Sequence, residues 1–143
     1  MAQTSDSDWL EVMRQKACAP VRRRPRHDED TLQTACRQWF DMQHRNFSLL
    51  LHHSPNEGLL VRRAADGAKR KAMGVRAGFP DFIFLLPTKA APYLCIELKT
   101  TKGKQSDSQK EYQRMVESVG GKYVVIRSLE EFINTVNDYI SNI

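Results

Sequence analysis

The 143-residue sequence is poor in cysteine and has no long apolar run, and both absences narrow its class. An odd number of cysteines at wide spacing excludes a disulfide framework and a CxxC zinc half-site and favours reduced thiols, here Cys18, Cys36 and Cys95. No apolar run approaches the roughly 20 residues of a membrane-spanning helix, so we expect a soluble globular protein without a membrane partner. The first residues lack the pattern of a secretory signal, and the expected location is the cytoplasm.

Basic residues exceed acidic ones, and the excess is clustered. Lys and Arg total 22 against 17 Asp and Glu, a net charge of +5. This balance suits a polyanionic partner, although many basic proteins have none. The length allows one domain with a real core plus a tail. We predict a basic N-terminal arm over residues 1–27, which is either a solvated linker or a nucleic-acid contact, and a single domain over 28–143.

Hydrophobic periodicity predicts alternating helices and strands. Asp28 or Asp30 can cap the first helix of the domain, and Ser128 can cap the last. The predicted elements are a short amphipathic helix over 9–17, a helical stripe over 32–40, strands over 47–51 and 59–61, a short helix or ordered loop over 62–73, strands over 82–86 and 93–99, a helical stripe over 112–119, a strand over 123–126 and a helix over 129–140. This order predicts an α/β layer sandwich.

Acidic and basic residues at the predicted strand pair carry the chemistry. Glu97 and Lys99 are two residues apart and therefore face the same side of a strand, and a hairpin would bring Asp81 beside Glu97. Two carboxylates plus water suit Mg²⁺, and a lysine can orient an attacking water or stabilise developing charge. The alternative is that Glu97 and Lys99 are exposed edge residues and Asp81 a turn residue. However, Glu97 interrupts an apolar run, where a charge is costly without a partner.

A longer motif carries a family resemblance. The segment Met73-Gly74-Val75-Arg76-Ala77-Gly78-Phe79-Pro80-Asp81, followed by Ile96-Glu97-Leu98-Lys99 and Ser106-Asp107-Ser108-Gln109, resembles the VRR-NUC (virus-type replication-repair nuclease) branch of the PD-(D/E)XK nucleases. The resemblance covers about residues 29 to 139. It implies a restriction-endonuclease-like layer sandwich, in which a central mixed sheet is flanked by helices, and metal-dependent hydrolysis of phosphodiester bonds.

The resemblance also implies roles for individual residues. Asp81 and Glu97 match the family's metal-binding acids, with the backbone carbonyl of Leu98 as a further ligand for Mg²⁺ or Mn²⁺. Lys99 matches the catalytic lysine.

Two further matches have ordinary structural alternatives. Gln109 matches a motif glutamine near the active site, but it also completes a capping box with Ser106. Glu29 matches an acid that joins the metal site through water or orients Lys99, but it is also a favourable first-turn acid. The family's loop usually reads Pro-Asn-Gly-Gly before an arginine, whereas residues 55–58 here read Pro-Asn-Glu-Gly.

Basic clusters on both sides of the acids fit a channel for a DNA backbone, or else are merely solvated. They are Arg62, Arg63, Lys69, Arg70, Lys71 and Arg76 before the acids, and Lys102, Lys104 and Lys110 after them. No histidine spacing fits a zinc site, so we interpret His27, His44, His52 and His53 as structural or phosphate contacts.

We therefore predict a metal-dependent, structure-selective DNA endonuclease. One site per chain requires two copies to cut two strands, and small stand-alone members of the family resemble dimeric resolvases of four-way junctions. The expected partners are branched or double-stranded DNA and a second copy, in replication, recombination, repair or phage genome processing, with the protein nucleoid-associated when bound. The alternatives are flap or nicking activity, a DNA-binding module that does not cut, and an enzyme of small phosphorylated molecules, for which no P-loop or Nudix pattern is present.

Overall fold

The computed structural model describes residues 6–17, 27–55 and 64–143, and its elements alternate between helix and strand. In chain order they are α1 (Asp6–Ala17), α2 (His27–Gln43), the 3₁₀ helix η1 (Arg45–Leu50), β1 (Leu51–His53), α3 (Ala64–Ala72), β2 (Phe82–Phe84), β3 (Leu94–Leu98), α4 (Asp107–Ser118), β4 (Lys122–Ile126) and α5 (Leu129–Ile140). Within these residues, no helix is long and apolar enough to cross a membrane.

The four strands form one mixed sheet in the order β1-β2-β3-β4. The β1–β2 and β2–β3 pairs are antiparallel, whereas β3 and β4 are parallel and are joined through α4. All five residues of β3 are buried. A continuous apolar run is typical of a strand covered on both faces, so β3 lies at the centre of the domain.

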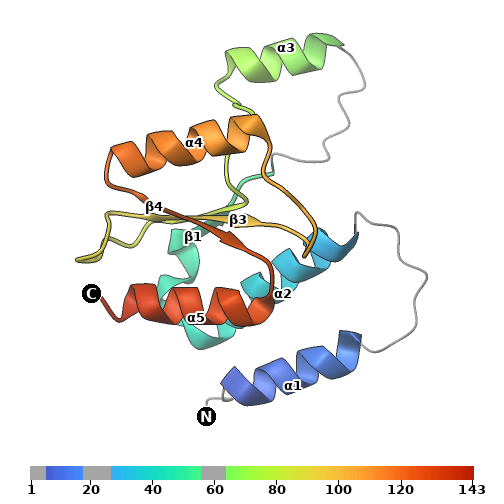
Figure 1. Ribbon diagram of the computed structural model, residues 1–143, viewed down its shortest axis with the longest axis vertical. Helices are drawn as coiled ribbons and strands as arrows, with labels where there is room; N and C mark the ends of the chain where they lie inside the picture. The colour runs from blue at the N-terminus through green and yellow to red at the C-terminus, as the bar shows by residue number, and fades with distance from the viewer. Residues whose placement is uncertain (1–5, 18–26, 56–63) are drawn as a thin grey trace.

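Helices cover both faces of the sheet (Figure 1). In that view α4 lies on one face, while α2 and α5 lie on the other. The larger core cluster joins α2 and α5 to the sheet through side chains such as Trp39, Phe82 and Phe132, and a smaller one lies under α4 around Cys95 and Tyr123. The α/β layer sandwich with a central mixed sheet is therefore confirmed.

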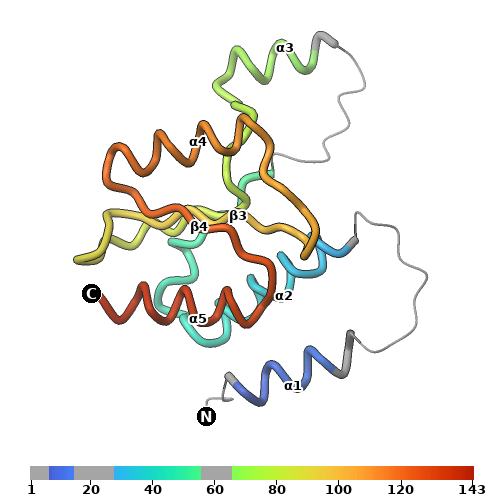
Figure 2. Tube along the Cα trace, viewed as in Figure 1, coloured from blue at the N-terminus to red at the C-terminus, as the bar shows by residue number. Residues whose placement is uncertain are grey.

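Helix α1 is the outermost element on the α2 and α5 side of the chain trace (Figure 2). Its side chains Trp9, Leu10 and Met13 pack against the main core. The amphipathic helix expected over 9–17 is thus present, and its apolar stripe has a partner. The arginine-rich part of the predicted arm, residues 21–26, lies outside the described residues.

Two local expectations are wrong. Residues 45–50 form η1, and β1 begins only at Leu51, although the apolar run predicted a strand over 47–51. The reason is Arg37 of α2, whose guanidinium donates to the carbonyls of Ser48 and Leu51 while Asp41 accepts from the Ser48 hydroxyl.

Helix α2 begins at His27, which places Asp28 and Asp30 inside its first turn rather than at the cap. The second expected strand, 59–61, lies outside the described residues.

The buried cysteines are free thiols, as expected. Cys36 and Cys95 lie in the cores without a disulfide. Burial raises the pKa of Cys95 to about 11 and raises the pKa of Cys36 further, so both thiols stay protonated at neutral pH.

Gly78 fixes the motif segment against α4. Its φ is +84°, and a Cβ built on it would lie 2.4 Å from the carbonyl oxygen of Ser108 in the first turn of that helix. Only glycine combines this backbone angle with such a close approach. The next residue, Phe79, packs edge-on to Tyr112 with ring centroids 5.2 Å apart. The turn that leads to Asp81 is therefore anchored on α4.

We predict that Gly78→Ala is much more costly than Gly120→Ala. Gly120 has the same φ of +84° but has no atom within 4 Å of its Cβ position. Its substitution carries the left-handed backbone penalty of about 1 kcal/mol, whereas Gly78→Ala also displaces backbone and is expected to cost more than about 3 kcal/mol in free energy of unfolding. Urea unfolding of both variants checks this, and equal midpoints would contradict the close packing.

Candidate active site

The strand pair β2–β3 brings Asp81 beside Glu97. Phe82 pairs with Ile96 in an antiparallel register, so the preceding Asp81 lies opposite Glu97. The Asp81 carboxylate is fixed because its Oδ2 accepts a hydrogen bond from the backbone N–H of Leu98 at 2.6 Å. The hairpin arrangement expected from the sequence is therefore present.

Glu97 is the most buried charged side chain of the described residues, with 1% of its surface exposed. Its Oε1 accepts from the Lys99 ammonium at 2.8 Å and from the Gln109 side-chain amide, and its Oε2 accepts from the Tyr123 hydroxyl at 3.3 Å. Each carboxylate oxygen accepts along two directions. Among the described residues Oε1 has two donors and Oε2 has one.

The electrostatics of the site follow from burial and from two adjacent acids. Burial raises the pKa of Glu97 to about 7, and the negative charge of Asp81 raises it as well, against the effect of Lys99. Burial lowers the pKa of Lys99, but its hydrogen bond to Glu97 and the charges of Glu97, Glu29 and Asp81 outweigh this, so its pKa is raised. Burial and the Glu97 charge raise the pKa of Tyr123, which therefore remains a hydrogen-bond donor.

The donor set fits a divalent cation. Two carboxylates from adjoining strands repel each other, and a cation between them would relieve that repulsion. Mg²⁺ is commonly held by one or two carboxylates with water completing an octahedron. Asp81, Glu97 and the neighbouring Leu98 backbone would supply such a set. Among the described residues no three His, Cys, Asp or Glu side chains are arranged so that together they could hold a metal ion, so the set has only two carboxylates.

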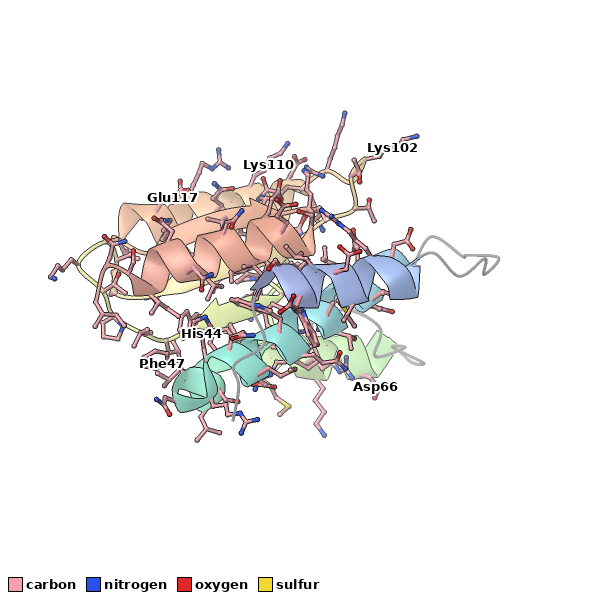
Figure 3. The ribbon with its side chains drawn as sticks, turned by 90° about the horizontal axis from the view of Figure 1, so that it is seen from below. His44, Phe47, Asp66, Lys102, Lys110 and Glu117 are labelled. Atoms are coloured by element: carbon pink, nitrogen blue, oxygen red, sulfur yellow. The ribbon has the colours of Figure 1, made fainter. Side chains whose placement is uncertain are left out.

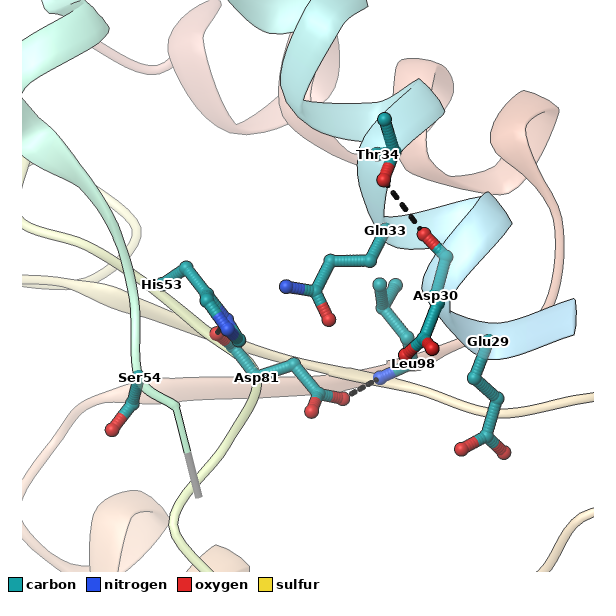
Figure 4. Close-up of a pocket in the computed structure, with 8 residues that line it drawn as sticks. All are labelled: Glu29, Asp30, Gln33, Thr34, His53, Ser54, Asp81 and Leu98. Carbon is teal, nitrogen blue, oxygen red and sulfur yellow. Dashed lines mark hydrogen bonds between the residues drawn. The ribbon is translucent and has the colours of Figure 1, made fainter. Parts of the chain in front are cut away.

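A polar cavity of about 270 Å³ opens beside Asp81, and neither Glu97 nor Lys99 is among the residues that line it (Figure 4). Its walls come from α2, the end of β1 and the ends of the β2–β3 pair, and its lining residues are Glu29, Asp30, Gln33, Thr34, His53, Ser54, Asp81 and Leu98. Glu29 reaches from α2 to the end of β3, where its Oε1 accepts from the backbone N–H of Thr100 at 3.2 Å. The first-turn acid therefore lies at the cavity as well as at the helix start.

Two further residues lie at the candidate site: Tyr123, which the sequence did not single out, and His53, which it indicated only as a structural or phosphate contact. His53 ends β1, lines the cavity, and binds the Asp81 carbonyl oxygen through Nδ1 at 2.8 Å. Its Nδ1–H donates, because a carbonyl can only accept. The backbone N–H of Ser54 donates to the same oxygen at 3.1 Å. Knowledge of the β1–β2 register, which pairs His53 with Phe82, would have indicated His53. Knowledge of the β3–β4 register, which pairs Tyr123 with Cys95, would have indicated Tyr123.

The Gln109 side chain makes contacts both at the start of α4 and with Glu97. Its Oε1 accepts from the backbone N–H of Ser106 at 2.8 Å, and its own N–H donates to the Ser106 hydroxyl, which completes the capping box of α4. The same amide donates to Glu97 through Nε2. One side chain therefore starts the helix and holds the buried carboxylate.

The basic residues predicted to contact DNA are distributed over separate elements. Lys69, Arg70 and Lys71 form the last turn of α3, and Arg62 and Arg63 lie outside the described residues. Arg76 donates through Nη1 to the Lys71 carbonyl at 2.8 Å and so completes the end of α3. Lys102 and Lys104 are exposed in the loop before α4, and Lys110 pairs weakly with Asp107 at 3.7 Å. Lys102 and Lys110 project from the same side of the molecule (Figure 3).

Comparison with known proteins agrees with this architecture. A solved structure of a VRR_NUC domain protein is similar to the chain, with 30% sequence identity and a TM-score of 0.70 over 80% of this chain and 89% of that one. No curated protein matches the chain significantly. The fold is thus that of a nuclease domain. The family model of the VRR-NUC domain matches residues 14–130, so the chain belongs to the VRR-NUC domain family, which implies a nuclease-type function with DNA binding.

We predict that Gln109→Glu destabilises the protein although it preserves the capping box. Ser-x-x-Glu caps a helix as well as Ser-x-x-Gln, but the new carboxylate replaces the donor to Glu97 with a like charge. The expected loss is about 1–3 kcal/mol in free energy of unfolding at pH 8 in EDTA.

Gln113→Glu is the matched control, because it makes the same change one turn later on α4. Gln113 donates to the exposed Glu117 at 2.8 Å, and like charges at this i,i+4 spacing cost no more than about 0.5 kcal/mol. Chemical denaturation of both variants provides the comparison. A Gln109→Glu variant as stable as the wild type would show that the interaction with Glu97 contributes nothing.

Proposed function

We propose that this protein is a Mg²⁺- or Mn²⁺-dependent DNA endonuclease whose metal is held by Asp81, Glu97 and the backbone carbonyl of Leu98. The observation that carries the proposal is the buried Glu97 carboxylate, which pairs with Lys99 at 2.8 Å and lies opposite Asp81, a residue that lines a polar cavity. A carboxylate buried in this way beside a second acid is costly in a structural role alone. The arrangement matches the nuclease-type function of the family.

The residues around the pair have distinct tasks in this proposal. When bound, the divalent cation would polarise the scissile phosphate and acidify a water. Lys99 keeps its proton and places a fixed positive charge where negative charge develops on the phosphate or where the attacking water must be oriented. Hydrolysis with the 3′ oxygen as leaving group gives 5′-phosphate ends, as is usual in the superfamily.

Gln109 and Glu29 act through other groups and are positioning residues. Gln109 fixes one face of the Glu97 carboxylate through its amide, which the capping box holds in one orientation. Glu29 holds the backbone after Lys99 through Thr100 and places a carboxylate on the cavity wall, where it can bind water. Oriented partners of this kind typically change metal affinity or activity by about 10- to 100-fold when removed.

The substrate class that we propose is branched DNA, with a four-way junction as the first candidate. One catalytic site per chain cuts one strand, so paired cuts across a junction require a second copy of the chain. Flap cleavage and simple nicking are the nearest alternatives, because each needs one cut only. A DNA-binding module that does not cut is the alternative from another class.

We predict that Asp81→Asn and Lys99→Ala each lower cleavage of a four-way junction by about 100-fold or more. Labelled junction, flap, nicked and linear duplex DNA are incubated with Mg²⁺, Mn²⁺ or EDTA. Asp138→Asn and Lys89→Ala are matched controls, because Asp138 pairs with Lys122 at the far end of β4 and Lys89 lies in the loop at the far end of the β2–β3 pair.

The outcomes separate the candidate functions. Symmetrical, metal-dependent cuts at the junction that only the site variants abolish support a resolvase and a homodimer. Cuts confined to flaps or nicks would support the nuclease activity but would make flap or nicked DNA the substrate class in place of the four-way junction. Tight DNA binding by wild type and Asp81→Asn alike, without cutting in either metal, identifies a non-catalytic module and contradicts the proposal.

We further predict that Lys102 and Lys104 bind phosphates of the DNA backbone. The double variant Lys102→Gln/Lys104→Gln is expected to flatten the slope of log affinity against log salt by about 0.9 for each phosphate that the protein no longer neutralises. Affinity is measured by fluorescence anisotropy at several salt concentrations. Lys89→Gln, at the far end of the sheet, should leave the slope unchanged. An unaltered slope in the double variant would show that these lysines do not bind DNA phosphates.

A further inference from the structure

The end of α3 is an ordered turn that presents apolar side chains. The N–H of Gly74 donates to the Lys71 carbonyl at 3.1 Å, and the N–H of Val75 donates to the Arg70 carbonyl at 3.0 Å. These two bonds, with Gly74 at φ +103°, are the Schellman arrangement that ends a helix. Arg76 donates to the Lys71 carbonyl and adds a cation at the negative end of the helix.

The turn leaves two apolar side chains uncovered by the described residues. Met73 is 75% exposed and Val75 50% exposed. In a Schellman turn the position of Val75 usually packs against an apolar residue at the position occupied here by Arg70. Here that position is occupied by the basic Arg70, so the apolar pair that is usual in such a turn is absent. We call Met73, Gly74 and Val75 the α3 tip.

The surroundings of the α3 tip are basic. Lys69, Arg70 and Lys71 precede it and Arg76 follows it, while no acidic residue occurs between Asp66 and Asp81. Two α3 tips brought together in a dimer would repel each other, and two side chains fall far short of the roughly 1,000 Å² that a stable protein interface buries. A polyanion that also offers an apolar surface fits better, and DNA offers its phosphates and its base faces.

The α3 tip is close in the chain to the candidate active site, and a segment that packs against α4 joins the two. The segment after Val75 passes through Gly78, which is pinned on the first turn of α4, and reaches Asp81. Figure 1 shows α3 beyond the end of α4, outside the two layers that enclose the sheet. No α3 residue belongs to either buried cluster of the described residues. Only five residues separate Val75 from Asp81, so a group that touches the α3 tip contacts a segment that leads directly into the candidate active site.

We propose that the α3 tip is a wedge that inserts Met73 and Val75 between bases at a branch point or other unstacked step of the DNA substrate. Apolar side chains flanked by basic residues unstack base steps in this way, at a cost that is lowest where the stack is already broken. The basic residues bind the adjoining phosphates and position the wedge. The inference rests on the proposed DNA endonuclease function and gives it a device that selects branched over regular DNA.

The test compares Met73→Ser/Val75→Ser with wild type in EDTA, so that binding is measured without cutting. Leu49→Ser is the matched control, because Leu49 of η1 is 96% exposed and lies on another element. Affinities are measured for a four-way junction and a linear duplex, and 2-aminopurine at the branch point reports unstacking through increased fluorescence. The double variant is expected to bind the junction about tenfold more weakly, with the fluorescence increase abolished. Duplex affinity and melting temperature should be unchanged.

Other outcomes overturn the wedge and separate it from the proposed function. If the double variant shows unchanged junction affinity and an unchanged fluorescence increase, the wedge proposal is wrong, while the proposed nuclease function is unaffected. An equal reduction on junction and duplex makes the α3 tip a general DNA-binding element. A change from dimer to monomer in sedimentation assigns the α3 tip to a self-interface. Wild-type protein that binds neither DNA refutes the proposed function itself.

Discussion

The structure around the site depends on one constraint, a carboxylate on a strand that is buried along its whole length. An unpaired buried carboxylate is among the most costly groups in a protein interior. Glu97 avoids this cost because its three partners come from three different places, namely the residue that follows its own strand, α4 and β4. The parallel β3–β4 pairing and the position of α4 over the sheet are therefore linked to the chemistry of a single side chain.

The same constraint explains why the site combines stable and unfavourable features. Asp81 raises the pKa of Glu97 instead of lowering it, so the two acids would be more stable apart. The backbone N–H of Leu98 and the partners of Glu97 hold them together. Local arrangements that oppose stability are expected at functional sites, where the surrounding fold compensates. Here the compensation comes from fixed hydrogen-bond donors and one lysine, all oriented before any ligand binds.

Much of this fold could be predicted from the sequence, because its signals are local. The strands β2 to β4 are short apolar runs bounded by turn residues, and the capping pattern before α5 is plain. The pairing of Asp81 with Glu97 followed from a hairpin. Helix η1 could not be predicted in this way, because it is held by Arg37 from 11 to 14 residues away.

The site residues that were missed have the same explanation. His53 and Tyr123 reach Asp81 and Glu97 only through strand register, and single-sequence patterns do not encode which strands are neighbours. Glu29 and Gln109 had two interpretations each, as helix-end residues and as site residues. The structure places each of them at both positions, so the alternatives did not exclude one another.

The double use of the Gln109 amide has a consequence for dynamics. The hydrogen bonds that begin α4 and the bond that holds Glu97 share one side chain, so opening of the first helical turn and release of the carboxylate are thermodynamically linked. Linkage is reciprocal. If fraying of this turn changes the affinity of Glu97 for a ligand by some factor, binding of that ligand changes the equilibrium constant for fraying by the same factor. The exchange rate of a single backbone amide proton, that of Gln109, thus becomes a gauge of events at a carboxylate that solvent scarcely reaches.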